Sequence, residues 1–530
     1  MAISIPQAPP FSKKSLWTFW GLVILVRISI TFLPSCEVDM GGYQNWSLYL
    51  ANHINQGFAS FYPDNHVVYA PFYMYFLLVT GIIAKFILGV QAWPEVPDFL
   101  VKMWAVGSDL IGALLIRQIG NHIGKARLAD ILAIGYLLNP AIFFNSSIWG
   151  QFDSMPATFL LATLYAFMRN RPVLAMLLFT IACLTKPQSG LLLPVVSVCY
   201  FRLLLTGENI YSVSKWKTLT LTALVCAAAY TVIVLPFYHH YTFYYNQKIS
   251  DPSIRENLLS VLAKPENLKG LSSEERETMQ TSRQVLSESG TQIQDIVQRM
   301  DGFKAPAAGL IIKGLNNTQG VKEAFSTDIF TETRVVTIDF ALWVINHYRL
   351  SVDDYPYASA NSFNFWTLVG RQTVLDSEPF LGIASAKFGL IVTLIGVLGI
   401  VPFGILTNSR SAFTLHFGSY LCLAWTFMFA TRMHERYLLP AIIFLTVSIF
   451  WDRKQWITLV LISSGSLANV WYVYERLKPD GGGAWYPNWQ WFPAISFSLL
   501  TLLAILYSAG HLAIIGIKRL KQALPESYSS

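Results

Sequence analysis

Long apolar runs alternate with short polar segments along most of the chain. Ten of the thirteen runs are 16 to 26 residues long, which is about the length an α-helix needs to cross the hydrocarbon core of a bilayer. Because lipid offers backbone groups no hydrogen-bond partners, such runs favour helices. The runs cover residues 15–34, 71–89, 99–120, 128–144, 155–167, 173–184, 190–205, 218–238, 382–406, 413–430, 438–450, 456–473 and 492–517. The pattern therefore predicts an all-α polytopic membrane protein.

The basic residues predict how the runs are oriented. Lys13 and Lys14 precede the first run, and Lys and Arg are enriched on the cytoplasmic side of membranes. The segment that follows the first run is therefore expected outside. An ordinary crossing by residues 71–89 would place the basic segment around Arg117 and Lys125 outside as well. We therefore interpret 71–89 as a re-entrant or shallow segment, which leaves about twelve complete crossings, or thirteen if it also crosses.

The polar segments divide the chain into three predicted parts. Residues 1–237 form an N-terminal transmembrane module with an outer loop at 35–70, and residues 382–530 form a C-terminal transmembrane module. Between them, 238–381 is the largest hydrophilic stretch, and residues 327–349 carry apolar positions at helical spacing. We expect an external loop region of amphipathic, interfacial helices there. No internal repeat is apparent, which disfavours a transporter built from inverted repeats.

Composition narrows the class further. The chain is 53% hydrophobic and 13% charged, with a mean hydropathy of +0.44, which excludes an ordinary soluble globular protein. The net charge of +7 is spread over short loops, so it indicates topology and no nucleic-acid partner. The five cysteines show no CxxC or metal-like spacing, and no disulfide framework is expected.

Two carboxylates follow the first apolar run directly. Glu37 and Asp39 lie two positions apart, just above the predicted membrane surface. A carboxylate in such a place suits a general base that removes a proton from a sugar hydroxyl. Solvated loop acids are the alternative. Asp39 is the candidate catalytic residue, and Glu37 is its nearest competitor.

Two further polar clusters fall on the same predicted side. Trp149, Gln151 and Asp153 combine an aromatic face with hydrogen-bonding groups, as in a sugar platform, although Asp153 also suits a helix N-cap. Lys186 and Gln188 lie at the outer end of a run, where a lysine suggests a local anion. Snorkelling of that lysine to lipid phosphate is the alternative.

The densest charge cluster lies between two late runs. Arg432, His434, Glu435 and Arg436 fall within five positions. Two arginines suit a phosphate or pyrophosphate through charge-assisted hydrogen bonds, and a mutual salt-bridge cluster is the alternative. The sequence is not an HExxH zinc motif, because Leu438 occupies the last ligand position.

Three polar residues stand in or beside apolar runs. Arg27 and Asp109 lie inside predicted crossings, where charge is disfavoured by about 2.5 to 3.5 kcal/mol each. We expect them to pair with each other or to line a cavity. Asn364 belongs to a polar-aromatic strip at 361–366, suited to contact a sugar or an isoprenoid chain. An interfacial aromatic belt is the alternative there.

Taken together, these motifs resemble the GT-C superfamily of polyprenyl-phosphate-sugar-dependent glycosyltransferases. Among them, the combination is most similar to bacterial Gpi18-like or PIG-V-like mannosyltransferases. The motifs are Glu37-Val38-Asp39, Tyr69-Ala70-Pro71-Phe72-Tyr73, Trp149-Gly150-Gln151-Phe152-Asp153-Ser154, Thr185-Lys186-Pro187-Gln188, Asn361-Ser362-Phe363-Asn364-Phe365-Trp366 and Met433-His434-Glu435-Arg436-Tyr437-Leu438. The resemblance implies a GT-C fold of about 12 to 13 transmembrane helices with external loops of interfacial helices.

The resemblance also implies a reaction and assigns roles. Asp39 would activate an acceptor hydroxyl, which attacks the donor sugar with inversion, and the leaving group is a polyprenyl phosphate. The resemblance favours mannose as the sugar. The donor phosphate would be held by Arg432, Arg436 and Lys186. Sugar or acceptor would be bound by Glu37, Trp149, Gln151, Asp153, Gln188, Asn364, His434 and Glu435. No cofactor is required, although a divalent metal ion between Glu37, Asp39 and Asp153 is an alternative.

The expected partners are a polyprenyl-phosphate-linked sugar donor, a hydroxyl acceptor on a glycan, lipid or protein, and membrane lipids. The expected location is the plasma (inner) membrane, with the site facing the periplasm or exterior. Competing readings are a lipid-linked glycan flippase or transporter, an undecaprenyl-pyrophosphate glycan polymerase or ligase, and a non-catalytic scaffold. Polar clusters confined to one predicted face argue against a transport path, and a scaffold leaves the cluster at 432–436 unexplained.

Overall fold

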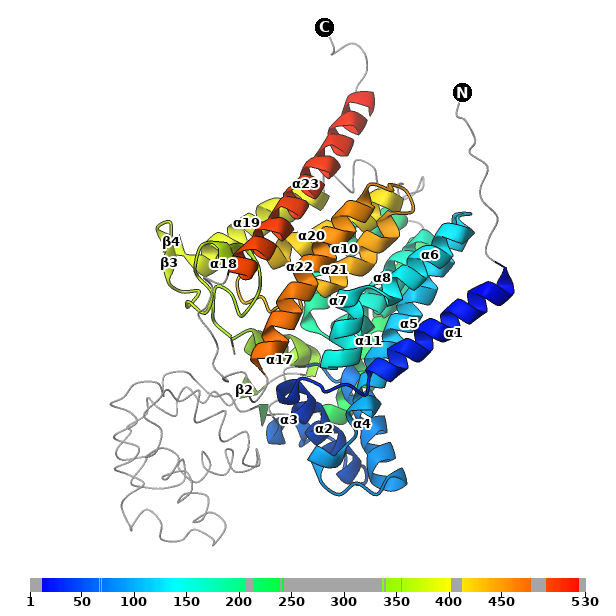
Figure 1. Ribbon diagram of the computed structural model, residues 1–530, viewed down its shortest axis with the longest axis vertical. Helices are drawn as coiled ribbons and strands as arrows, with labels where there is room; N and C mark the ends of the chain where they lie inside the picture. Colours follow the sequence, from blue (N-terminus) through cyan, green and yellow to red (C-terminus); the bar gives the residue numbers. More distant parts are fainter. Residues whose placement is uncertain are drawn as a thin grey trace. The chain divides into compact units, whose positions relative to one another are not determined.

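A computed structural model describes most of the apolar runs (Figure 1). The described residues are 12–65, 67, 69–205, 213–238, 241–242, 336–337, 340–353, 355–401, 412–477 and 492–523. Most of the hydrophilic region expected at 238–381 to carry amphipathic helices lies outside them. The described parts of the predicted amphipathic stretch 327–349 form the short strand β2 (Val336–Thr337), η8 (Phe340–Leu342) and the start of α17 (Trp343–Asp353).

The described chain is almost entirely helical, which confirms the predicted all-α polytopic class. It separates into two units, one of residues 1–52, 69–233 and 351–530, and the other of residues 53–68 and 234–350. The first unit contains α1 (Lys13–Ile30), α2 (Glu37–Asn52), α4 (Phe72–Ile82), η1 (Ile83–Ile87), η2 (Trp93–Glu95), α5 (Asp98–His122), α6 (Ala126–Leu137), α7 (Pro140–Phe143), η3 (Phe144–Trp149), α8 (Ser154–Met168), α9 (Pro172–Cys183), η4 (Pro187–Leu192), α10 (Leu193–Leu205), nearly all of α11 (Val213–Val234), α18 (Phe365–Leu368), β3 (Pro379–Phe380), β4 (Ile383–Ala384), α19 (Ser385–Gly399), α20 (Ala412–Phe429), α21 (Leu439–Ser448), α22 (Gln455–Arg476) and α23 (Phe492–Ala523).

The second unit has few described elements. It contains α3 (Phe61–Asp64), η5 (Leu235–Phe237), η8 and most of α17. Its short strands β1 (Tyr241–Thr242) and β2 (Val336–Thr337) pair antiparallel, with Tyr241 opposite Thr337. In the first unit, β3 and β4 form a similar hairpin-like pair with Pro379 opposite Ala384.

Fewer helices than predicted are long and apolar enough to cross a membrane. Within the described residues there are six, or seven if the pair α6 and α7–η3, bent by 44°, forms one span. The difference from about twelve has two causes. The first run folds as α1, but its eighteen residues include three basic ones, Lys13, Lys14 and Arg27. Several other runs, including those that form α8, α9, α19 and α21, give apolar helices of only 10–17 residues.

The segment predicted to be re-entrant forms a short apolar helix. Residues 72–87 fold as α4 continued by the π-helix η1, and they fall in the same class of 10–17 residues. α4 packs so closely on α2 that a Cβ on Gly81 would lie 1.9 Å from the carbonyl oxygen of Ser47. Only a glycine allows two helix backbones to approach so closely.

The core of the first unit is built around α21. Every residue of this helix is buried, and α20 and α22 lie on either side of it (Figure 1). Arg27 and Asp109 form an ion pair inside this unit, which confirms the predicted pairing. The guanidinium also donates to the hydroxyls of Ser147 (3.0 Å) and Ser146 (2.7 Å) and to the Leu137 carbonyl (2.9 Å). The Arg27 guanidinium is therefore fully partnered, as burial of a charge favours, whereas of the two Asp109 oxygens Oδ2 accepts from Arg27 and Ser146 and Oδ1 has no partner within the described residues.

Candidate functional site

The first turn of α2 carries the candidate base. The sequence predicted that Asp39 lies in an outer loop, but the helix already begins at Glu37. Because α2 has 3.6 residues per turn, side chains two positions apart point roughly 200° away from each other. Glu37 is accordingly exposed, whereas Asp39 is half-buried and accepts a hydrogen bond from the Trp149 indole at 2.7 Å. The structure thus separates the two competing carboxylates.

A turn after η3 brings the second cluster to α2. The π-helix η3 ends at Trp149, and Gly150 follows in the left-handed conformation with φ +94°. A Cβ on Gly150 would lie 2.4 Å from the Met40 methyl group, so the turn needs glycine for both conformation and space. The Cys36 amide donates to the Trp149 carbonyl at 3.4 Å, which ties the start of α2 to the same turn.

Asp153 and Lys186 form a buried ion pair beside this turn. Their side chains are 4% and 1% exposed, and Lys186 Nζ lies 2.7 Å from an Asp153 carboxylate oxygen. Asp153 holds the N-cap position of α8 but makes no capping bond, since its other oxygen accepts from Asn145 Nδ2 at 3.3 Å. Lys186 is therefore not extended toward lipid. The Asp153 carboxylate pairs with Lys186 and does not cap α8.

Gln151 links this pair to α2. Its Oε1 accepts from the Tyr43 hydroxyl at 2.9 Å and from Lys186 Nζ at 3.4 Å. The ammonium also lies over the rings of Phe152, at 4.3 Å, and Tyr69, at 5.2 Å. Aromatic faces near a cation stabilise it when water is excluded.

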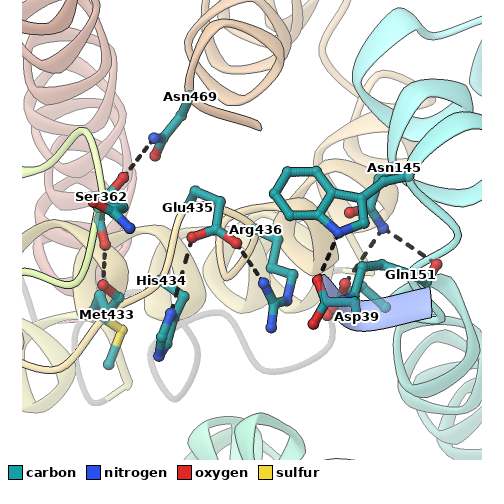
Figure 2. Close-up of polar contacts among 12 residues, drawn as sticks. Asp39, Asn145, Gln151, Ser362, Met433, His434, Glu435, Arg436 and Asn469 are labelled. Atoms are coloured by element: carbon teal, nitrogen blue, oxygen red, sulfur yellow. Dashed lines mark hydrogen bonds and ion pairs between the residues drawn. The ribbon is translucent and has the colours of Figure 1, made fainter. Parts of the chain in front are cut away.

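The connector between α20 and α21 contributes a second buried pair. Arg436 Nη1 is hydrogen-bonded to a Glu435 carboxylate oxygen, with side chains 12% and 3% exposed. His434 Nδ1 lies 3.9 Å from the other oxygen of Glu435. The Arg436 guanidinium is 6.0 Å from the Trp149 ring centre, and Figure 2 shows it between Glu435 and Asp39.

Electrostatics join these groups into one cluster, which we call the charged cluster: Asp39, Asp153, Lys186, Glu435 and Arg436. Burial raises the pKa of Glu435, Arg436 opposes this, and Asp39 adds to the rise. Burial disfavours the charged guanidinium of Arg436, but Glu435 and then Asp39 outweigh it, so that its pKa is raised. Burial, followed by Arg436 and Lys186, lowers the pKa of His434 to about 3, so this imidazole is neutral at physiological pH.

Two predicted residues are engaged elsewhere. Arg432, expected at the donor phosphate, forms an ion pair with Asp376 at 2.7 Å and donates to the Val352 carbonyl at 2.9 Å. Asn364, expected at the sugar, caps α18 by accepting from the Trp366 amide and donates to the Phe427 carbonyl at 3.2 Å. Both side chains hold the connection at 352–384 against α20 and its end.

Gln188 lies at a small pocket next to the charged cluster. The pocket is lined by Asp153, Lys186, Gln188 and Tyr437 together with apolar side chains. Within the described residues, Gln188 Oε1 is buried without a hydrogen-bond partner, and the same holds for Gln151 Nε2, Asn145 Oδ1 and Arg436 Nε. Buried polar atoms normally have partners, so four such atoms close together mark this part of the chain as a candidate binding site.

Tyr43 and Asn145 belong to the site although they were not chosen from the sequence. Tyr43 lies four positions after Asp39 on the same helix, a spacing that puts both on one face. In the sequence, this spacing indicates a shared helix face only if the helix is taken to begin at Glu37. Asn145 gave only a polar residue near the end of an apolar run.

No grouping of three or more His, Cys, Asp or Glu side chains in the described part of the chain is arranged to hold a metal ion. Of the three acids considered for a divalent ion, Glu37 is exposed and Asp153 is paired with Lys186. The absence of a cofactor requirement stays a prediction.

One family model matches the chain. It is described as GPI transamidase subunit PIG-U, and it matches residues 49–251. The matched stretch is less than half of the chain; it includes Trp149, Gln151, Asp153 and Lys186, and it excludes Asp39 and the connector with Glu435 and Arg436. No curated protein matches the sequence. The comparison relates this part of a multi-pass membrane protein to subunits of a membrane enzyme complex, and it does not assign glycosyl transfer.

Proposed function

We propose that the protein is an integral membrane glycosyltransferase that moves a sugar, mannose by resemblance, from a polyprenyl-phosphate donor to a hydroxyl acceptor with inversion. One observation carries the proposal. Within the described residues, Asp39 is the acid of the charged cluster that has no cationic partner, whereas Asp153 is paired with Lys186 and Glu435 with Arg436. An unpaired, half-buried carboxylate oriented by an indole N–H suits a general base.

In this reaction Asp39 accepts the proton of the acceptor hydroxyl. The acceptor oxygen forms a bond to the anomeric carbon as the bond from that carbon to the phosphate oxygen breaks. The phosphate leaves with the electron pair, and Arg436 and Lys186 stabilise its charge. Cations fixed in a poorly hydrated site act strongly on a charge that develops during the reaction.

The polar atoms without partners fit the binding of a sugar. The Oε1 atom of Gln151 is fixed by Tyr43 and Lys186, so its Nε2 is a donor with a fixed direction. Asn145 Nδ2 is held by Asp153, which leaves Oδ1 as an acceptor. Gln188, Trp149 and His434 complete the proposed sugar and acceptor contacts. We further propose that the site faces the periplasm or exterior from the plasma membrane, on the basis of Lys13 and Lys14 at the start of α1.

The family-model match favours a second candidate. By the description of that family, the chain would be a subunit of a membrane enzyme complex. This function needs the fold and a partner surface but no free base. It therefore expects no product from the isolated chain.

Incubation of the purified full chain, reconstituted in nanodiscs, with a panel of polyprenyl-phosphate sugars and hydroxyl acceptors separates the two. Mass spectrometry of the products is expected to detect a glycosylated acceptor and free polyprenyl phosphate with at least one donor. Lack of any product from every donor, with the donor still bound by the protein, would favour the subunit.

A further inference from the structure

The charged cluster already holds more negative than positive charge. It contains three carboxylates, Asp39, Asp153 and Glu435, and two cations, Lys186 and Arg436. Both cations are paired, and the side chains of both pairs are 12% exposed or less. The cations therefore do not form the open wall that a phosphate needs. A donor phosphodiester would bring a second uncompensated negative charge into a site of low dielectric, which is strongly unfavourable.

The two pairs differ in how firmly the carboxylate is held. Asp153 accepts from Lys186 and from Asn145, and Lys186 has further contacts with Gln151 and two rings. The Glu435 carboxylate is held by Arg436 and by a backbone hydrogen bond at Glu435 itself, since His434 is 3.9 Å away. Arg436 still has a buried Nε without a partner. The Glu435–Arg436 pair is thus the one that can open with the smaller loss of hydrogen bonds.

We propose that Glu435 takes up one proton from solvent when the lipid-phosphate sugar binds, which releases Arg436 to the phosphate. This inference rests on the proposed function. The balance is simple: one negative charge arrives with the phosphodiester, one proton adds to the Glu435 carboxylate, and Arg436 stays protonated. The net charge of the cluster is then the same before and after binding.

The other titratable groups that face Glu435 are expected to keep their protonation states when the donor binds. The proton is therefore expected on Glu435. His434, from the same connector, is already neutral, and binding of an anion does not require it to change. Burial raises the pKa of the Cys36 thiol, at the start of α2, and of the Tyr437 phenol, so both stay protonated. Asp39 faces the cluster from α2 and must stay ionised to act as base. Arg436 alone among the nearby side chains lowers the pKa of Glu435, so its departure favours protonation.

The direction of the pH effect follows from linkage. The pKa of Glu435 is higher in the complex than in the free protein. Affinity is therefore fully present below the free-protein pKa and is lost as pH rises through the pKa of the complex. Between these two values, the Kd is expected to increase about tenfold per pH unit.

The test is calorimetric titration of the full chain in nanodiscs with a short-chain isoprenyl phosphomannose. This phosphodiester carries one fixed negative charge, so the probe itself does not titrate. The titration is repeated in buffers of different ionisation enthalpy, which counts protons, and from pH 5 to 9. The expected result is uptake of one proton per bound probe, with the pH dependence of Kd abolished in Glu435→Gln. Glu378→Gln, which changes an exposed carboxylate outside the cluster, is the matched control and should keep both.

Three results would overturn the inference. Binding without proton uptake is the first, and uptake that persists in Glu435→Gln but disappears in Asp39→Asn is the second. Binding that requires Mg²⁺ in place of a proton is the third. Failure of the phosphomannose to bind at any pH would instead contradict the proposed donor, and with it the proposed function. Folding of Glu435→Gln is checked by its thermal unfolding midpoint, and Glu435→Leu, which also removes the titrating carboxyl group, is used if the glutamine variant does not fold.

Discussion

Three buried charge pairs in the first unit differ in how the polar groups around them are partnered. The Arg27 guanidinium reaches Asp109, two serine hydroxyls and a backbone carbonyl, so each of its three nitrogens has a partner. The Lys186–Asp153 and Arg436–Glu435 pairs lie instead among buried polar atoms that lack partners, on Gln151, Asn145 and Arg436. The difference is one of degree, because Asp109 Oδ1 also lacks a partner within the described residues. A group of several such atoms beside two ion pairs fits the proposed binding of a polar ligand.

The largest effect is expected for the double variant Lys186→Met/Asp153→Leu. This variant tests whether the Lys186–Asp153 pair serves the proposed site or only holds helices together. Removing both partners of a buried ion pair leaves no unpaired charge, so stability is expected to stay near that of the wild type. Transfer activity is expected to fall at least about 10²-fold, because the phosphate loses a cation that stabilises its developing charge. Thermal unfolding and turnover measured on the same preparation check both parts. An active double variant would show that this pair only holds helices together.

The Arg27–Asp109 pair predicts the opposite pattern. Arg27→Met alone leaves Asp109 buried without its partner, which is expected to destabilise the protein by about 3 to 5 kcal/mol. Arg27→Met/Asp109→Leu is expected to recover most of this stability and, unlike the cluster variant, most of the activity. A denaturant titration of the single and double variants measures the coupling. Loss of activity in a stable double variant would show that this pair also serves the site.

A substitution in the turn at Gly150 is expected to have a smaller effect on stability and turnover. Gly150→Ala requires an alanine at φ +94° and places its Cβ against Met40, next to Asp39. The left-handed conformation disfavours alanine by about 1 to 2 kcal/mol, and the clash is expected to move Trp149 from Asp39 and reduce turnover. Gly124→Ala is the matched control, since its φ is +74° and no atom lies within 4 Å of the added Cβ. Equal turnover in the two variants would mean that the Trp149 turn does not position Asp39.

Sequence reasoning reached the class of the fold and the partners of the buried charges, but not the local geometry. The Arg27–Asp109 pair was predictable because a lone charge in an apolar run needs a counter-charge. The partners of Arg432 and Asn364 were not predictable because Asp376 and the Phe427 carbonyl lie 56 and 63 positions away in sequence. Within the described residues, fewer helices than predicted are long and apolar enough to span a membrane, because several apolar runs form helices of only 10–17 residues. The roles assigned to Asp39, Lys186 and Arg436 stay predictions.

The most direct test of the central claim is single-turnover transfer by Asp39→Asn with the donor that the wild type uses. The asparagine keeps an oxygen that can accept from the Trp149 indole but cannot act as a base, so donor binding is expected to persist while the rate falls about 10²- to 10⁴-fold. The same change at the exposed neighbour, Glu37→Gln, is expected to reduce the rate far less. A normal rate in Asp39→Asn, with the donor bound, would contradict the assignment of Asp39 as the catalytic base.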